Sequence, residues 1–274
     1  MVEYVIANTT VVPVRENPSE GAEQLTQLLF GEVCEVLDRL PRWTKIRSTL
    51  DGQEGWVDFK MVSLASSLIA SSPNRLDTIV ATPMAAATPM DGGADLLLTL
   101  GTRLPNYSHG TFEVLGQQYL INPTCVSTAQ RSTGEADLQQ SDLQRSDLAT
   151  IAQSLLNAPY LWGGKNLMGI DCSGFTQVVY AAMGVNLLRN AREQMTQGEL
   201  VSSLSESLTG DLAFFDHADR DPKATNISHV GLLLSPTEII HCSGCVHIDS
   251  IDEEGIHLSD GSLTHHLVQI KRYL

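Results

Sequence analysis

Positive charge is scarce in this chain. Its 274 residues include 17 Lys and Arg against 32 Asp and Glu, which gives a formal net charge of −15 at pH 7. An acidic surface repels the phosphates of nucleic acids and the headgroups of anionic lipids. The composition therefore argues against a nucleic-acid partner and against binding to a membrane, and it leaves peptide substrates open.

Long apolar runs are also lacking. No run approaches the roughly 18 residues that a transmembrane helix needs. The segment Met1–Asn8 has neither the basic part nor the apolar part of a secretory signal peptide. On these grounds the sequence predicts a cytoplasmic protein, or an extracytoplasmic one if the natural N-terminus has been trimmed.

The cysteine pattern does not indicate a disulfide framework, because the five cysteines are odd in number and unevenly spaced. Cys242 and Cys245 lie close to His241 and His247, and all four are residue types that bind zinc. A structural zinc site needs four converging ligands, but no second Cys-x-x-Cys pair is present. Strand alternation also sends His241 and Cys242 to opposite faces. We therefore expect no metal and no cofactor.

One cysteine has a distinctive setting. The segment Pro159–Gly164, which contains Tyr-Leu-Trp-Gly-Gly, is followed by Asp171-Cys-Ser-Gly-Phe. Residues 173–184 predict an amphipathic helix that Asp171 would cap and Gly184 would end. Cys172 would then lie at the helix N-terminus, where the helix dipole favours a thiolate. The apolar face of this helix would consist of Phe175, Val178, Val179 and Ala182.

Two histidines follow far downstream. His229 begins the run His-Val-Gly-Leu-Leu-Leu, which is typical of a buried strand, and His241 ends a second apolar run. The turn-like segment Ser235–Glu238 between them predicts a hairpin that brings both histidines to one end of a sheet. A thiol nucleophile, a histidine base and a further polar side chain are the minimal set of a cysteine hydrolase. In this interpretation His229 is the general base and His241 orients it.

These motifs resemble those of the NlpC-type papain-like cysteine peptidases of bacterial cell-wall metabolism, over roughly residues 146–274. The resemblance implies an α+β domain in which a helix carrying Cys172 packs on an antiparallel sheet. It implies that Cys172 is the nucleophile, His229 the base and His241 the third triad member, with Tyr160 helping to form the oxyanion hole. It further implies a substrate groove to which Asp171, Ser173 and Trp162 contribute.

The first half of the chain predicts short strands separated by turn residues. Residues 1–65 resemble a bacterial SH3 domain, and residues 76–127 resemble a divergent second copy, so two small SH3-like β-barrels would precede the catalytic domain. Residues 128–145 are polar and predict a linker, and Ala149–Asn157 predicts the first helix of the domain that follows. The strands predicted in the first barrel are Val2–Ile6, Val11–Arg15, Gln24–Phe30, Glu32–Leu37, Trp43–Ser48 and Glu54–Val57.

Two SH3 copies ahead of such a domain narrow the resemblance to the YkfC-type γ-D-glutamyl-L-diamino acid endopeptidases. Resemblance to these endopeptidases implies a substrate groove that the first SH3 domain closes at one end. It also implies a substrate with a free N-terminal L-alanine, whose amine Glu54 would contact. Members usually carry Arg-Asp-Ser where this chain has Asn190 and Ala191 after its Arg. Either another acid, Glu54 or Glu193, supplies the missing charge, or the pocket does not bind a free amine.

The leading hypothesis is a monomeric cysteine endopeptidase that hydrolyses the γ-D-glutamyl–diamino acid bond of peptidoglycan stem peptides and muropeptides, in cell-wall recycling or turnover. L-Ala-γ-D-Glu-diaminopimelate is the expected type of substrate. Two alternatives stay open. One is an acyl transferase or amidase that uses the same Cys-His-His triad on another amide, and the other is a non-catalytic muropeptide-binding module.

Overall fold

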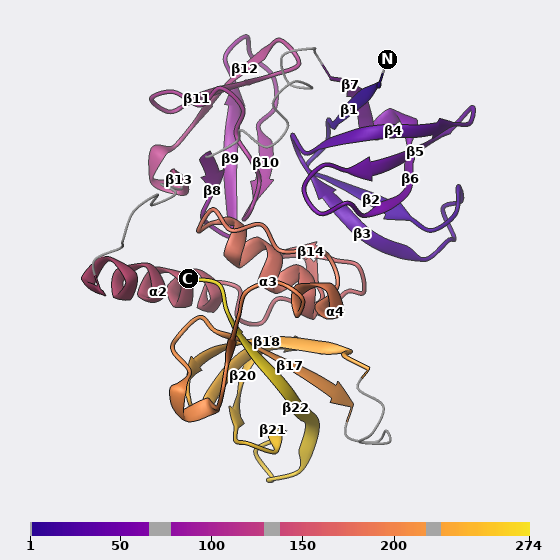
Figure 1. Ribbon diagram of the computed structural model, residues 1–274. Coiled ribbons are helices and arrows are strands. Elements are labelled where there is room, and N and C mark those ends of the chain that lie inside the picture. The colour runs from indigo at the N-terminus through magenta and orange to yellow at the C-terminus, as the bar shows by residue number, and fades with distance from the viewer. Residues whose placement is uncertain (1, 66–77, 129–137, 218–225) are drawn as a thin grey trace. The chain divides into compact units, whose positions relative to one another are not determined.

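The computed structural model describes residues 2–65, 78–128, 138–217 and 226–274 (Figure 1). Two compact units make up the chain. The first comprises residues 1–131 together with 162–167, and the second comprises residues 132–161 together with 168–274. Strands dominate both units, and among the described residues the α-helices all belong to the second. The predicted α+β class is therefore confirmed only in part.

A seven-stranded antiparallel sheet, in the order β3-β2-β6-β5-β4-β1-β7, forms the first part of the first unit. All six predicted strands are present, and a short 3-10 helix, η1, leads into the seventh. Val12 and Val14 of β2 are fully buried while the residues beside them are not, which is the period of two expected of a strand with one face in the core. The elements are β1 (Tyr4–Ala7), β2 (Val11–Arg15), β3 (Gln24–Leu29), β4 (Val33–Arg39), β5 (Trp43–Ser48), β6 (Glu54–Asp58), η1 (Phe59–Met61) and β7 (Val62–Leu64).

The second part of this unit shares a core with the first. This second part consists of a four-stranded sheet in the order β10-β9-β12-β11 and a two-stranded sheet, β13-β8. Phe30 of the first part joins Phe112 and Tyr119 in one apolar cluster, where the Phe112 and Tyr119 rings stack 5.1 Å apart. The elements are β8 (Thr78–Val80), β9 (Met84–Pro89), β10 (Leu96–Thr99), β11 (Thr111–Val114), β12 (Gln117–Ile121), η2 (Pro123–Cys125) and β13 (Val126–Thr128).

The segment after the Trp-Gly-Gly motif also belongs to the first unit and contains the short strand β14 (Lys165–Asn166). Lys165 Nζ lies 3.0 Å from Glu32 Oε1, and both side chains are buried. The Lys165 backbone N–H and Asn166 Nδ2 both donate to Gln27 Oε1, at 2.9 and 2.8 Å. Ion pairing and hydrogen bonding thus fix this segment against β3 and the residue that precedes β4.

The second unit is built on a seven-stranded antiparallel sheet in the order β16-β22-β17-β18-β19-β20-β21, with an additional pairing of β21 and β22. Figure 1 shows its helices gathered on one side of these strands, and α3 packs against β18 and β19. The elements are α2 (Leu138–Gln153), β15 (Gly169–Ile170), α3 (Cys172–Ala181), α4 (Ala191–Gln194), β16 (Glu199–Val201), η3 (Leu204–Glu206), β17 (Leu212–His217), β18 (His229–Ser235), β19 (Glu238–Ser243), β20 (Cys245–Ile251), β21 (Gly255–His257) and β22 (Leu263–Arg272).

Helix α3 confirms the prediction made from its motif. The Asp171 side chain accepts a hydrogen bond from the backbone N–H of Gly174 at 2.6 Å and so caps the helix. All four residues of the predicted apolar face are buried. Gly184 has a positive φ of 78°, a conformation that suits glycine just past a helix end. Cys172 is therefore the first residue of the helix.

The first helix of this unit begins earlier than predicted, at Leu138 instead of Ala149. Residues 138–145, predicted to be linker, are therefore helical, and the rest of that linker beyond Thr128 lies outside the described residues. The buried face of α2 contains Arg145 together with Leu148 and Ala152. Arg145 lies 3.6 Å from the buried Asp211 and donates to the Thr209 carbonyl. Because Arg145 is charged, its position on the buried face interrupts the apolar pattern from which the helix would have been predicted.

None of the helices in the described part of the chain combines the length and the apolar character needed to cross a membrane.

Candidate active site

Cys172 stands at the N-terminus of α3 with a thiol that is almost fully buried. Burial raises its pKa to about 12, and the neighbouring Asp171 carboxylate adds to the rise. The backbone N–H of Val230, the Arg189 guanidinium and the backbone N–H of Ser173 act in the opposite direction. The expectation of a lowered pKa at the helix N-terminus was therefore wrong, because loss of water outweighs these donors. The resting side chain is a thiol, and its attack requires a base.

The two predicted histidines form a direct pair, as the hairpin required. Strands β18 and β19 are antiparallel neighbours, and Gly231 lies opposite His241. His229 Nε2 lies 2.8 Å from His241 Nδ1, and both rings are buried. A methyl group at Gly231 would lie 2.9 Å from His241 Cβ, closer than such atoms approach, so the glycine leaves room for the pair. Val230, whose N–H reaches the Cys172 thiol, follows His229 directly.

A third histidine packs on the pair. The His265 ring, from β22, stacks on His229 with ring centroids 4.4 Å apart and planes inclined by 29°. Phe215 of β17 lies on another side of the same ring, 6.0 Å away. These contacts hold the His229 ring between strands β17, β19 and β22. His265 could not be predicted from the sequence around His229, because its contact with His229 depends on pairings between strands that are remote in the chain.

Two further residues, both from β20, extend the histidine pair, and this role was not predicted from the sequence. His241 Nε2 lies 3.1 Å from Asp249 Oδ2, and His247 Nε2 lies 3.0 Å from the same oxygen. These three atoms lie within 4.8 Å of one another, which is close enough for one cation. Hydrogen bonds to the shared carboxylate oxygen account for the cluster without one. The alternation His247, Ile248, Asp249 was the available signal, because it places the two polar side chains on one face of a strand.

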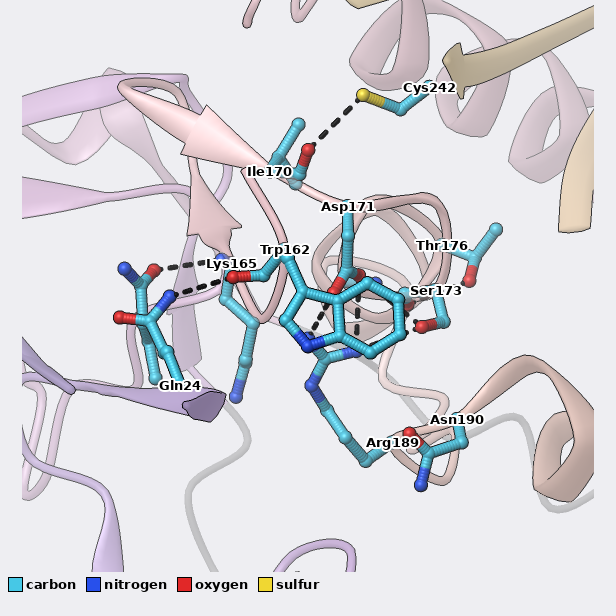
Figure 2. Close-up of polar contacts among 12 residues, drawn as sticks. Gln24, Trp162, Lys165, Ile170, Asp171, Ser173, Thr176, Arg189, Asn190 and Cys242 are labelled. Atoms are coloured by element: carbon cyan, nitrogen blue, oxygen red, sulfur yellow. Dashed lines mark hydrogen bonds and ion pairs between the residues drawn. The ribbon is translucent and has the colours of Figure 1, made fainter. Parts of the chain in front are cut away.

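A buried ion pair supports the helix end that carries Cys172. Arg189 is 1% exposed, and its guanidinium binds both Asp171 carboxylate oxygens, at 2.5 and 3.1 Å (Figure 2). The same guanidinium donates to Ser173 Oγ at 2.8 Å. Asp171 and Ser173, predicted to line the substrate groove, thus have intramolecular partners in Arg189. Arg189 was not among the predicted site residues.

Tyr160 lies near the thiol. Its backbone N–H donates to the Gly244 carbonyl at 2.8 Å, and its side chain is partly exposed. Burial raises the pKa of its hydroxyl, and the charges of Cys172 and Asp171 add to the rise. Tyr160 therefore keeps its proton at neutral pH and can donate a hydrogen bond close to Cys172.

Asn190 and Ala191 mark the start of α4. Asn190 is the N-cap residue, and both its backbone N–H and its Nδ2 donate to Glu193 Oε2, at 3.1 and 3.0 Å. Asn190 lies beside Arg189 in Figure 2, and its side chain is exposed, whereas Ala191 is buried. The local structure thus couples the Asn that replaces the family's usual Asp to a carboxylate one turn later.

The two remaining predicted site residues, Trp162 and Glu54, belong to the first unit. Trp162 Nε1 donates to Glu23 Oε1 at 2.8 Å, and its carbonyl accepts from Gln24 Nε2 at 3.0 Å, yet its side chain stays largely exposed. Glu54 lies 2.6 Å from Arg47 and 3.6 Å from Lys45. Its charge is therefore already matched by two cations.

Comparison with known proteins agrees with the resemblance drawn from the motifs. Residues 157–261 match the NlpC/P60 family, and residues 10–63 match the bacterial SH3 domain. The chain is 27% identical over 230 residues to a γ-D-glutamyl-L-lysine dipeptidyl-peptidase of Bacillus cereus (strain ATCC 10987 / NRS 248) and 28% identical over 229 residues to one of Bacillus subtilis (strain 168). Each alignment covers 79% of this chain, and they cover 66% and 71% of those relatives' lengths.

The fold has a counterpart over its whole length. The crystal structure of an NlpC/P60 family protein from Bacillus cereus ATCC 10987 superimposes with a TM-score of 0.80 at 20% identity, covering 99% of both chains. This likeness establishes the architecture, and the two sequence matches establish the relationship. The chain therefore contains an NlpC/P60 domain, which has the papain-like fold, together with a bacterial SH3 domain.

Proposed function

We propose that this protein is a cysteine peptidase that hydrolyses the γ-D-glutamyl–diamino acid bond of peptidoglycan-derived peptides. The observation that carries the proposal is the position of the Cys172 thiol. It lies on the first turn of α3, at the backbone N–H of Val230, and the residue before Val230 is one half of the His229–His241 pair. The related dipeptidyl-peptidases supply the substrate class.

The first chemical step adds the Cys172 sulfur to the substrate carbonyl and forms a tetrahedral intermediate. His229 takes the proton of Cys172 while the sulfur attacks the γ-carbonyl carbon of D-glutamate. His229 Nε2 already contacts His241, so the proton goes to Nδ1. A base is essential here, because burial holds the pKa of the thiol at about 12.

The later steps use the same groups. The Tyr160 hydroxyl and the backbone N–H of Cys172 donate to the oxyanion as it develops, which is the arrangement that stabilises tetrahedral intermediates. His229 then gives its proton to the amine of the diamino acid, the C–N bond breaks, and the γ-D-glutamyl group stays on Cys172 as a thioester. Water, deprotonated by His229, hydrolyses the thioester and restores the thiol.

The N-terminal amine of the substrate needs a negative partner if it is bound free. Glu193 suits this role better than Glu54. Glu193 contacts the amide of Asn190, a neutral group, whereas Glu54 is already paired with Arg47 and Lys45. A charge-assisted contact is about twice as strong as a neutral hydrogen bond, so Glu193, which forms no ion pair with any described residue, has the advantage. We assign the amine to Glu193.

Mass spectrometry of defined peptides tests both the reaction and this assignment. L-Ala-γ-D-Glu-L-Lys and L-Ala-γ-D-Glu-meso-diaminopimelate are each incubated with the enzyme, beside the same peptides acetylated at the alanine amine. We expect cleavage on the carboxyl side of γ-D-Glu for the amine form, and at least tenfold slower cleavage after acetylation. Glu193→Gln should remove most of that tenfold preference, because it removes the charge and keeps the shape.

The other outcomes identify the alternatives. Equal cleavage of both peptide forms would mean that no free amine is required and that larger wall fragments are substrates. Binding of the peptides without turnover would indicate a non-catalytic muropeptide-binding module. Transfer of the acyl group to an added amine, in preference to water, would indicate an acyl transferase. The cytoplasmic location and the monomeric state stay predictions.

Gly231 offers a direct test of the histidine pair. We expect Gly231→Ala to lower kcat by about 100-fold, because the added methyl group meets His241 and Ile239 and shifts the His241 ring away from His229. The kinetics are measured on the same γ-D-glutamyl peptide. Gly21→Ala is the control, since nothing lies within 4 Å of the position its methyl group would take. Unchanged kcat in Gly231→Ala would contradict the role of the pair.

A further inference from the structure

We propose that Asp249 is a positioning residue that fixes the proton arrangement of the His229–His241 pair and so makes Nδ1 of His229 the nitrogen that accepts the Cys172 proton. The inference deepens the proposed peptidase mechanism and rests on it for its catalytic consequence. The proton arrangement itself can be measured without any substrate. Four groups carry it, and they are linked by hydrogen bonds of 2.8 to 3.1 Å.

The first step concerns Asp249 and His241. The hydrogen bond from His241 lowers the pKa of Asp249, so Asp249 is an ionised carboxylate that can only accept. His241 is 1% exposed, and burial lowers its pKa, so its ring is neutral at pH 7 and carries one proton. Because Nε2 faces the carboxylate oxygen at 3.1 Å, that proton resides on Nε2. Nδ1 of His241 is then an acceptor.

The second step passes this arrangement to His229. His229 Nε2 lies 2.8 Å from His241 Nδ1, and one of the two nitrogens must donate. Since His241 Nδ1 is the acceptor, His229 Nε2 carries the proton. A neutral His229 ring has only one proton, so its Nδ1 bears the basic lone pair. This tautomer is the one that can take a proton from the thiol.

The third step is what the loss of Asp249 would do. Without the carboxylate, His241 can place its proton on Nδ1 and donate to His229 Nε2. His229 would then hold its own proton on Nδ1 and could not accept one from Cys172. The carboxylate also stabilises the charge that spreads over the pair once His229 is protonated. Both effects belong to the reacting state, so kcat changes and substrate binding does not.

The groups around the hydrogen-bonded series Asp249–His241–His229 also hold the Asp249 carboxylate in place. His247 Nε2 donates to the same Asp249 oxygen, and His247 Nδ1 lies 2.7 Å from the Cys245 carbonyl. Both ring nitrogens of His247 thus face oxygen acceptors, one on each side of the ring. Among the described residues, His265 of β22 stacks on His229, and Val230, which follows His229, has its backbone N–H at the Cys172 thiol of α3. None of these is a second carboxylate at His241.

The proton arrangement is tested by nitrogen NMR of protein labelled at histidine, in the intact chain at neutral pH. The signals of His229 and His241 are identified among those of the eight histidines by their loss in His229→Gln and His241→Gln. In the wild type we expect His241 to carry its proton on Nε2 and none on Nδ1. In Asp249→Asn and Asp249→Ala we expect a larger fraction of the tautomer that is protonated at Nδ1. A wild-type His241 protonated at Nδ1 would overturn the proposal, whatever the variants do.

Kinetics supply the second readout. Asp249→Asn keeps the size of the side chain, and we expect it to lower kcat by about 100-fold with KM within twofold of the wild type and an unchanged melting temperature. The rate at which iodoacetamide alkylates Cys172, which needs no substrate, should fall in parallel. Asp249→Glu should restore part of both rates. A loss confined to KM or to melting temperature would show a merely structural role and refute the proposal.

The control is a matched pair in the same unit. Asp252 Oδ1 accepts from His257 Nε2 at 2.9 Å, but its carboxylate is largely exposed and the pair lies outside the chain that ends at His229. Asp252→Asn should leave both rates unchanged. If the wild type cleaves no γ-D-glutamyl peptide but shows the expected tautomers, the proposed substrate is wrong and the role of Asp249 stands. If it cleaves the peptide and Asp249→Asn keeps both tautomer and rate, the reverse holds.

Discussion

Replacement of Cys172 by alanine should abolish hydrolysis of the γ-D-glutamyl peptide, with a loss in kcat on the order of 10⁶-fold. The reason is that the acyl group has no other acceptor in the described part of the site. Asp171 is bound to Arg189, and Tyr160 keeps its proton because burial raises its pKa. The loss should occur without a change in KM, because the side chain acts on the reacting bond.

His229→Ala should cost nearly as much as Cys172→Ala, and the double variant should be no worse than either. Residues that act as one unit show this non-additivity, since the loss of one makes the other useless. Release of the diamino acid is followed by mass spectrometry over several hours, which keeps slow turnover measurable. Cys125→Ala is the control, because this half-buried thiol belongs to the first unit. Turnover near the wild-type rate in Cys172→Ala would end the peptidase proposal.

The pH dependence of thiol alkylation separates the base from the nucleophile. Burial raises the pKa of Cys172 to about 12, so in His229→Ala the thiolate forms unaided and the alkylation rate should rise about tenfold per pH unit between pH 7 and 11. In the wild type the rate at pH 7 should be far higher and the slope smaller, because His229 accepts the proton. Equal rates at pH 7 would mean that His229 does not activate the thiol.

The elements that carry the triad were predictable because each has a short-range signal. The apolar period of α3, its Asp171 cap and the turn between two apolar runs are all readable within a few residues. The pairing of His229 with His241 follows from the hairpin alone, since two strands joined by a tight turn are neighbours. The six strands of the first barrel were predicted for the same reason.

The supporting residues were not predictable, because they depend on contacts that are remote in the chain. Asp249 reaches His241 only through the register of β19 and β20, in which His241 lies opposite His247. Arg189 and Arg145 are charged, and charged residues are seldom buried. A prediction from the periodicity of apolar residues therefore places both on the surface. The pKa of Cys172 depends on how much water the fold removes, which no local motif reports.

Removal of the Arg189 side chain should have the largest effect on stability of any single substitution considered. We expect Arg189→Met to lower the free energy of unfolding by about 3–5 kcal/mol, because it leaves the Asp171 carboxylate buried with no cation. Asp171 is 6% exposed, so water cannot replace the guanidinium. For a unit of this size the melting temperature should fall by roughly 10 °C. Arg189→Lys should restore only part of the loss, since an ammonium cannot bind both carboxylate oxygens and Ser173 together.

Arg47→Met is the matched control for that experiment. The Arg47–Glu54 ion pair has a separation of 2.6 Å, almost the same as the 2.5 Å between Arg189 and Asp171. Unlike Arg189 and Asp171, the side chains of Arg47 and Glu54 are both substantially exposed. Water solvates Glu54 once Arg47 is gone, so the melting temperature should stay close to that of the wild type. Equal shifts in the two variants would show that burial of the pair is irrelevant. A shift in Arg189→Met alone, together with faster amide hydrogen exchange in the first turn of α3, would show that the pair holds the helix end from which Cys172 acts.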